Sequence, residues 1–175
     1  MRYRRSITSG GTYFFTVNLL NRRQPLLIEQ IELLRHTIRQ VKARHPFHIN
    51  AMVILPDHLH AILTLPADDS DYSKRWMLIK SGFSRGVAKA ETINASRRSK
   101  GERGIWQRRY WEHLIRDDRD YEKHLDYIHY NPVKHGWVER ASDWPFSSMH
   151  RYIRNGMLNK DWGLGASLAD DGFGE

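Results

Sequence analysis

The sequence predicts an α+β fold of the ferredoxin-like, split βαβ kind, with a central antiparallel sheet and a further tyrosine-bearing helix towards the C-terminus. The hydrophobic patterns follow the order strand, helix, strand, strand, helix, strand, and no internal repeat interrupts that order. The length of 175 residues suits a single domain with a real core. We expect residues 1–154 to form this domain and residues 155–175 to form a loosely ordered tail.

The first strand and the first helix have clear patterns. Residues 12–19 are aromatic and β-branched, and Gly10-Gly11 precedes them as a breaker. A helix follows, and its apolar residues recur at spacings of four, three, four and three: Leu27, Ile31, Leu34, Ile38 and Val41. His45-Pro46 should end this helix, because the residue before a proline avoids the α region.

Two more strands should follow as a hairpin. Residues 47–55 and residues 58–65 are both strand-like, and Pro56-Asp57 makes a tight turn between them. We therefore expect them to pair antiparallel. In the ferredoxin-like topology the first and third strands lie in the middle of the sheet, so residues 58–65 should be central.

The third strand carries a pair of histidines. Side chains repeat with period two along a strand, so His58 and His60 lie on one face and Leu59 lies on the other. Two residues of strand cover roughly 6.6 Å, so both imidazoles can lean towards one small object. A divalent metal is the usual candidate for that object. The pair alone is a weak signal, since two packed strand histidines without a metal are the more common explanation.

The next helix carries one cation in its apolar stripe. Ser70 or Asp71 can cap this helix, and its apolar residues are Trp76, Ile79, Phe83 and Val87. Lys80 falls inside this stripe by helical angle. It either extends past the edge of the core or reaches towards a phosphate.

The following segment is polar and then aromatic. Residues 91–104 form a charged loop, which we expect to be flexible and to act as a basic flap. Residues 105–115 are expected to form the fourth strand, and they mix aromatic side chains with Arg108 and Arg109. This mixture suits a surface that stacks on bases and contacts phosphates, although core tryptophans explain part of it.

The last predicted helix has two distinct faces. Asp117 or Asp118 caps it, and its buried stripe comprises Tyr121, Leu125 and Ile128. On another face Tyr127 and Asn131 are one turn apart and can point at a common spot. Pro132 should end or bend the helix at Asn131. Asn131 is either a ligand-type side chain or the cap of a short turn that begins at the proline.

Composition restricts the partners and the chemistry. The formal charge is +8 and the sequence pI is about 9.9, which favours a polyanionic partner such as nucleic acid. The candidate phosphate contacts are Arg22, Arg23, Lys80, Arg108, Arg109 and Lys134. The absence of cysteine excludes disulfides and thiolate ligands or nucleophiles. No run is long enough to span a membrane and no signal-peptide core is present, so we expect a cytoplasmic protein without membrane partners.

Several of these stretches resemble a known family. His58-Leu59-His60 resembles the His-hydrophobic-His motif of HUH endonucleases. Residues 126–138 resemble the tyrosine helix of REP-associated tyrosine transposases, which are bacterial single-tyrosine relatives of insertion-sequence transposases. The similarity extends, in the family's order, to residues 11–18, 106–113 and 142–148. The insert at 91–104 and the C-terminal tail match no family feature.

The resemblance implies a chemistry. Residues 1–154 would be the catalytic domain, with Tyr127 as the nucleophile and His58, His60 and Asn131 as ligands of Mg²⁺ or Mn²⁺. Attack on single-stranded hairpin DNA would form a 5′-phosphotyrosine link and release a 3′-hydroxyl. The bond energy is kept in this link, so the reverse attack rejoins DNA without a nucleotide cofactor. We expect a monomer or a homodimer.

Two other functions remain open at this point. One is a metal-dependent nuclease in which water attacks the phosphate, and this enzyme would leave no covalent protein–DNA adduct. The other is a non-catalytic module that binds hairpins without metal, and it would bind equally well after Tyr127→Phe.

Overall fold

The computed structural model describes residues 7–166, in which four strands form one antiparallel sheet in the order β2-β3-β1-β4. The strands are β1 (Thr12–Asn18), β2 (His48–Ile54), β3 (His58–Thr64) and β4 (Trp111–Leu114). This order is that of the ferredoxin-like fold, with β1 and β3 in the middle, and it confirms the predicted fold class.

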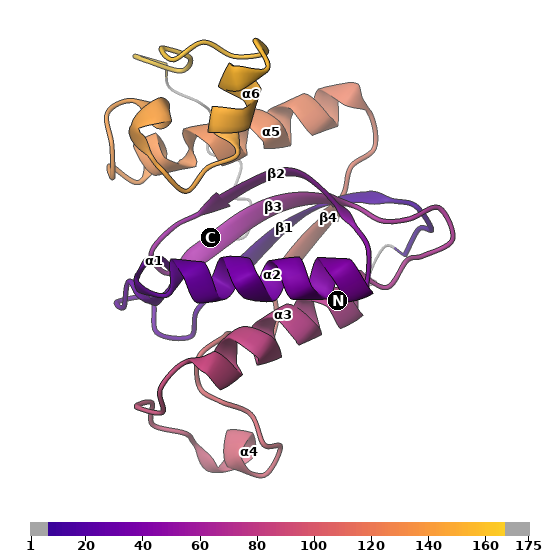
Figure 1. Ribbon diagram of the computed structural model, residues 1–175, viewed down its shortest axis with the longest axis vertical. Helices are drawn as coiled ribbons and strands as arrows, with labels where there is room; N and C mark the ends of the chain where they lie inside the picture. The colour runs from indigo at the N-terminus through magenta and orange to yellow at the C-terminus, as the bar shows by residue number, and fades with distance from the viewer. Residues whose placement is uncertain (1–6, 167–175) are drawn as a thin grey trace, which may run out of the picture.

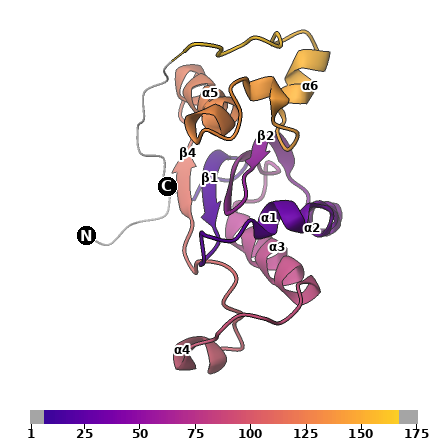
Figure 2. The ribbon, with the colours of Figure 1, turned by 90° about the vertical axis from the view of Figure 1, so that its left-hand side faces the viewer.

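Helices cover both faces of the sheet (Figure 1). The helices are α1 (Leu26–Glu29), α2 (Ile31–Arg44), α3 (Tyr72–Gly86), α4 (Ala95–Arg98), α5 (Asp118–Lys134) and α6 (Met149–Arg154), with a 3₁₀ turn η1 at Ala141–Asp143. Figure 2 shows α2 and α3 on one face of the sheet and α5 and α6 on the other. The short α4 lies beyond α3, at the opposite end of the molecule from α6.

The alternation of the central strands divides the core in two. Leu59, Ala61 and Leu63 of β3 belong to the large core under α2 and α3. Ile62 and Phe14 belong to a smaller core, which Tyr127 and Ile128 of α5 complete. The histidines of β3 share a strand face with Ile62, so they lie beneath α5.

The first predicted helix is two helices. Gln30, with φ −110° and ψ 33°, separates α1 from α2. The backbone N–H of Leu27 donates to the carbonyl of Pro56 at 3.1 Å, which ties α1 to the turn before β3. The apolar spacing could not predict this break, because Leu27 and Leu34 pack into the same core from separate helices.

The fourth strand is shorter than the predicted 105–115. Only Trp111–Leu114 belongs to β4, and Trp106 forms an isolated bridge with Leu19. Between them, the carbonyls of Gln107 and Arg108 accept hydrogen bonds from Nζ of Lys80, at 2.6 Å and 3.2 Å. A side chain of α3 therefore takes the acceptors that a strand partner would otherwise use.

The prediction that α5 ends or bends at Asn131 is wrong. The helix continues to Lys134, and the N–H of His135 donates to the carbonyl of Asn131 at 3.0 Å. Pro132 lies in the last turn, where its missing N–H costs only one helical hydrogen bond. The last helical residue is Lys134, and the chain turns out of the helix at Gly136. The φ of +69° at Gly136 allows a Schellman motif, in which the N–H of Trp137 donates to the carbonyl of Pro132.

The segments outside the sheet have fixed contacts where the structure describes them. The 91–104 segment, expected to be a flexible flap, contains α4, and its Arg103 pairs with Glu91. Residues 155–166 return towards α5, where the hydroxyl of Tyr130 donates to the carbonyl of Ala166. The rest of the predicted tail, residues 167–175, lies outside the described residues. Among the helices in residues 7–166, none has the length and apolar character needed to span a membrane.

Candidate active site between the sheet and helix α5

The two predicted histidines meet beneath α5. His58 and His60 are 1% and 0% exposed, and their ring centroids are 4.9 Å apart. In the β1–β3 register they lie opposite Asn18 and Thr16 of β1. The structure therefore brings the pair together on a buried polar strip of an otherwise apolar sheet face.

Hydrogen bonds orient both imidazoles through Nδ1. Nδ1 of His60 is 2.8 Å from Oγ1 of Thr16, and Nδ1 of His58 is 2.8 Å from Oδ1 of Asp57. Because Nδ1 of each ring is engaged in this way, Nε2 is the nitrogen that each ring would present to a metal. Such bonds to the far nitrogen are typical of metal-ligating histidines, since they fix the tautomer and the ring orientation.

Asp57 is ionised in this environment. Burial raises the pKa of its carboxyl, but hydrogen bonds and charges from His58 and Arg22 outweigh this effect and hold the pKa at about 2. Nε of Arg22 donates to Oδ2 of Asp57 at 2.6 Å, and its Nη2 is 3.3 Å from Nδ1 of His58. Arg22, predicted as a phosphate contact, thus braces the carboxylate that orients His58.

Tyr127 packs against the histidine pair from α5. It is 5% exposed, and its ring centroid is 5.2 Å from that of His60. Nζ of Lys134, seven residues further along the helix, donates to the hydroxyl of Tyr127 at 3.1 Å and lies 4.9 Å from the ring centroid. A positive charge therefore stands at the phenol oxygen.

Asn131 and His135 complete this face of α5. The ring of His135 is 5.2 Å from that of His58, while Tyr127 contacts His60. Asn131 is fully buried and lies four residues from each, so its helical turn stands over the histidine pair. Sequence reasoning missed His135 as a site residue, although its spacing of eight from Tyr127 predicts the same helical face.

The donor set fits a divalent ion. Two buried imidazoles with oriented rings and one buried amide side chain are hard-to-borderline donors. They would leave positions open for phosphate oxygens and water. His58, His60 and Asn131 are thus the residues that would hold such an ion.

The other two tyrosines of α5 face elsewhere. The hydroxyl of Tyr121 is 3.5 Å from that of Tyr152, and burial together with this contact raises the pKa of Tyr121 to about 12. Tyr130 donates to the carbonyl of Ala166 in the C-terminal segment. Their contacts lead away from the histidine pair, whereas Tyr127 lies against it.

Of the remaining predicted phosphate contacts, Arg108 and Lys80 bond groups outside this site. Arg23 and Arg109 are exposed, and Arg108 pairs with Glu102 at 2.7 Å near α4. Lys80 bonds the two carbonyls before β4, as expected for a lysine that extends past the core edge, and burial lowers its pKa to about 8. The segment that holds Arg108 nevertheless joins the site end of β1, because the N–H of Gln107 donates to the carbonyl of Asn18.

A model of a known protein family matches the part of the chain that contains these elements. The model of a family described as "Transposase IS200 like" matches residues 9–131. That stretch runs from just before β1 to Asn131 and includes both histidines and Tyr127.

Individual relatives cover nearly the whole chain. A protein of Escherichia coli K12 called "REP-associated tyrosine transposase" is 51% identical over 160 residues, which are 91% of this chain and 89% of the relative. A Haemophilus influenzae protein named for the same kind of transposase is 47% identical over 162 residues, 92% of each chain. The solved structure of a REP-associated tyrosine transposase bound to a REP hairpin is 48% identical, with a TM-score of 0.86, and covers 100% of this chain and 97% of its own.

Proposed function

We propose that this chain cleaves and rejoins hairpin-bearing single-stranded DNA through Tyr127. The premise is that the chain belongs to the IS200-like transposase family and, within it, to the REP-associated tyrosine transposases. The observation that carries the proposal is the packing of Tyr127 against His60, with the ammonium of Lys134 at its hydroxyl. A tyrosine, a cation and two oriented imidazoles are thereby gathered in one buried place.

The chain's own residues account for nucleophilic attack. The phenol oxygen of Tyr127 attacks phosphorus as its proton leaves, and Lys134 stabilises the negative charge that develops on that oxygen. The bond from phosphorus to the 3′ oxygen breaks, and this oxygen takes up a proton to become a 3′-hydroxyl. The product is a 5′-phosphotyrosine, and the reverse attack by a 3′-hydroxyl restores both starting groups.

The ligand residues prepare the site for a metal. Thr16 and Asp57 hold the rings of His60 and His58, so that both Nε2 atoms, with the amide of Asn131, would bind one Mg²⁺ or Mn²⁺. When bound, that ion would polarise the scissile phosphate and offset its negative charge. Burial under α5 excludes bulk water from the same place, which favours the tyrosine over water as nucleophile.

The substrate class is supported by charge and by similarity. The net charge of +8 favours a phosphate backbone, and the similar solved structure contains a REP hairpin. A buried nucleophile can only reach an unpaired strand, so the cleaved phosphate should lie in a single-stranded stretch beside the hairpin.

A covalent adduct tests this function. The full chain is incubated with 3′-end-labelled REP hairpins of its own genome in Mg²⁺ or Mn²⁺, denatured and separated by electrophoresis. We expect a labelled protein band that is lost with a chelator, in Tyr127→Phe and in His60→Ala, while hairpin binding is largely retained. Cleavage without an adduct would show hydrolysis by water, and binding without cleavage would show a binding module.

A further inference from the structure

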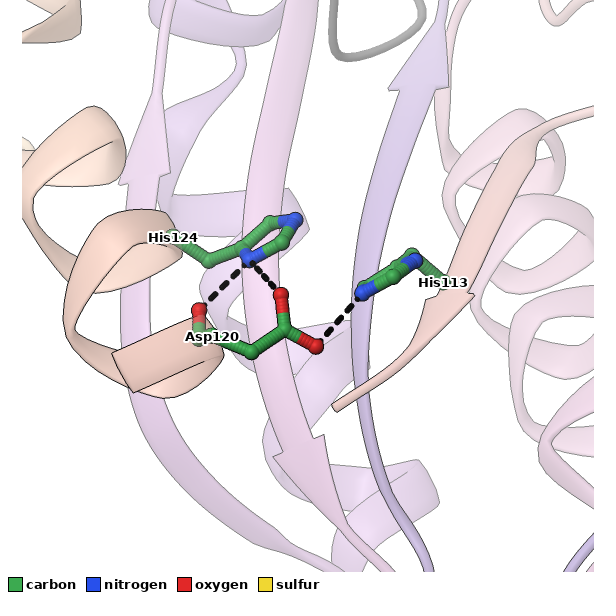
Figure 3. A group of neighbouring side chains, drawn as sticks. All are labelled: His113, Asp120 and His124. Atoms are coloured by element: carbon green, nitrogen blue, oxygen red, sulfur yellow. Dashed lines mark hydrogen bonds and ion pairs between the residues drawn. The ribbon is translucent and has the colours of Figure 1, made fainter. Parts of the chain in front are cut away.

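A second group of ligand-type side chains lies where β4 meets the start of α5 (Figure 3). His113 comes from β4, and Asp120 and His124 come from α5, one helical turn apart. The two imidazole rings stack with their centroids 4.6 Å apart, and the carboxylate of Asp120 bridges one nitrogen of each ring. One of its oxygens is 2.8 Å from Nε2 of His113, and the other is 3.2 Å from Nδ1 of His124.

The surroundings shift the pKa values of Asp120 and His124 towards the protonation states that bind a metal. Burial raises the pKa of Asp120, but hydrogen bonds from His113 and from the N–H of Arg116 outweigh it and lower the pKa below its usual value. Burial lowers the pKa of His124, which favours the neutral imidazole. An anionic carboxylate and a neutral imidazole are the forms that bind metal ions.

The distances fit a small ion. The three ligand atoms lie within 4.8 Å of one another. Two ligands bound about 2.1 Å from one zinc ion are roughly 3.0 to 3.4 Å apart, so the most widely separated pair would need to close by up to about 1.4 to 1.8 Å. The ion would replace the hydrogen bonds from both rings to Asp120, including the 2.7 Å contact of Nδ1 of His124 with the Asp120 carbonyl.

The group is accessible and distinct from the site under the other half of α5. The side chains of His113 and Asp120 are 21% and 18% exposed, which leaves a path for entry, while that of His124 is 3% exposed. Phe14 stands between the two places, with ring centroids 4.7 Å from His124 and 5.6 Å from His60. No ligand is shared between them.

We propose that His113, Asp120 and His124 form a second metal site, of the two-histidine, one-carboxylate kind, which binds Zn²⁺. Nitrogen donors favour zinc over magnesium, and three protein ligands leave one position for water. The ion clamps β4 to the first turns of α5, three and seven residues before Tyr127. Bound there, the ion stabilises the helix that bears the proposed nucleophile.

The test uses the full chain without DNA. Cobalt serves as a visible probe of the site, and zinc as the ion in thermal unfolding. The variant His113→Phe removes one ligand but keeps a ring over Trp111, which His113 stacks upon at 5.8 Å. The control His58→Ala/His60→Ala leaves all three ligands, and His48→Ala removes an exposed histidine of β2.

We expect wild type, His48→Ala and His58→Ala/His60→Ala all to show visible cobalt absorption from this site. Zinc at about a hundredfold excess over its dissociation constant should raise their melting temperature by about 5 to 10 °C. When His113→Phe or His124→Gln is added to His58→Ala/His60→Ala, which lacks the histidines of the site under α5, both signals should be lost, with circular dichroism confirming the fold.

The proposal would be overturned by an unchanged zinc shift when His113→Phe is added to His58→Ala/His60→Ala, or by loss of the shift in His58→Ala/His60→Ala alone. The result is independent of DNA cleavage. A failure to form a DNA adduct would refute the proposed function while leaving the zinc site in place.

Discussion

At the scale of single residues, the candidate site includes side chains that orient or stabilise its proposed catalytic groups. Asp57 and Thr16 hold Nδ1 of His58 and His60, and Lys134 stands at the hydroxyl of Tyr127. The histidines and the tyrosine were predictable from spacing and resemblance. Asp57 was not assigned a role, although its place directly before His58 is a signal, because only the folded turn shows which ring atom it contacts.

The role of Asp57 can be measured with Asp57→Asn. This change keeps the shape but removes the charge that orients His58, and loss of such a partner typically weakens metal affinity about 10- to 100-fold. We expect the Mn²⁺ concentration for half-maximal adduct formation to rise by that factor. Asp71→Asn, which changes the cap of α3, is the matched control. Equal metal requirements in both variants would remove Asp57 from the site.

At the scale of elements, the exact course of α5 positions the site. Helical spacing predicted the Tyr127–Asn131 face, because that face follows from 3.6 residues per turn. Of the predicted buried stripe only Ile128 is buried, whereas Tyr121 and Leu125 are partly buried. The extension through Pro132 was not predictable from the proline alone. It depends on the Schellman motif at Gly136, which ends the helix late enough to carry Lys134 and His135 to the site.

Gly136→Ala tests this helix end. An added Cβ meets no atom within 4 Å, so the cost is backbone strain at φ +69°, about 1 kcal/mol of unfolding free energy. We expect that loss in urea unfolding, together with slower adduct formation because Lys134 is displaced from Tyr127.

Gly101→Ala is the control for strain alone. Gly101 also has open space and a positive φ of +64°, but it follows α4 in the chain, and α4 lies at the other end of the molecule from α5 (Figure 1). A similar loss of stability with an unchanged adduct rate is expected. If Gly136→Ala also left the adduct rate unchanged, the helix end would have no part in positioning Lys134.

At the scale of the whole molecule, the order of elements was sufficient to predict the sheet. The patterns strand, helix, strand, strand, helix, strand admit few topologies, and the period of β3 decided which face carries the histidines. The group His113, Asp120 and His124 was beyond such reasoning, since it forms only when β4 and α5 meet.

The predicted phosphate contacts of Arg108 and Arg109 are tested by the salt dependence of hairpin binding. Arg108 and Arg109 follow the segment that meets the end of β1, which lies beside His58 in the sheet. Each true phosphate contact should reduce the slope of log affinity against log salt by about one, so Arg108→Ala/Arg109→Ala should reduce it by about two. Arg39→Ala on the exposed face of α2 should leave it unchanged. A slope equal to wild type in the double variant would remove both arginines from the interface.

The identity of the DNA-linked residue tests the central claim most directly. The chain is reacted with hairpin DNA in Mn²⁺ and digested with nuclease and protease, and the peptide that retains a nucleotide is sequenced by mass spectrometry. The contacts of Tyr127 with His60 and Lys134 predict that the nucleotide is attached to Tyr127. A nucleotide on Tyr130, whose hydroxyl is directed to Ala166, or on Tyr121 would contradict the assignment of the active site.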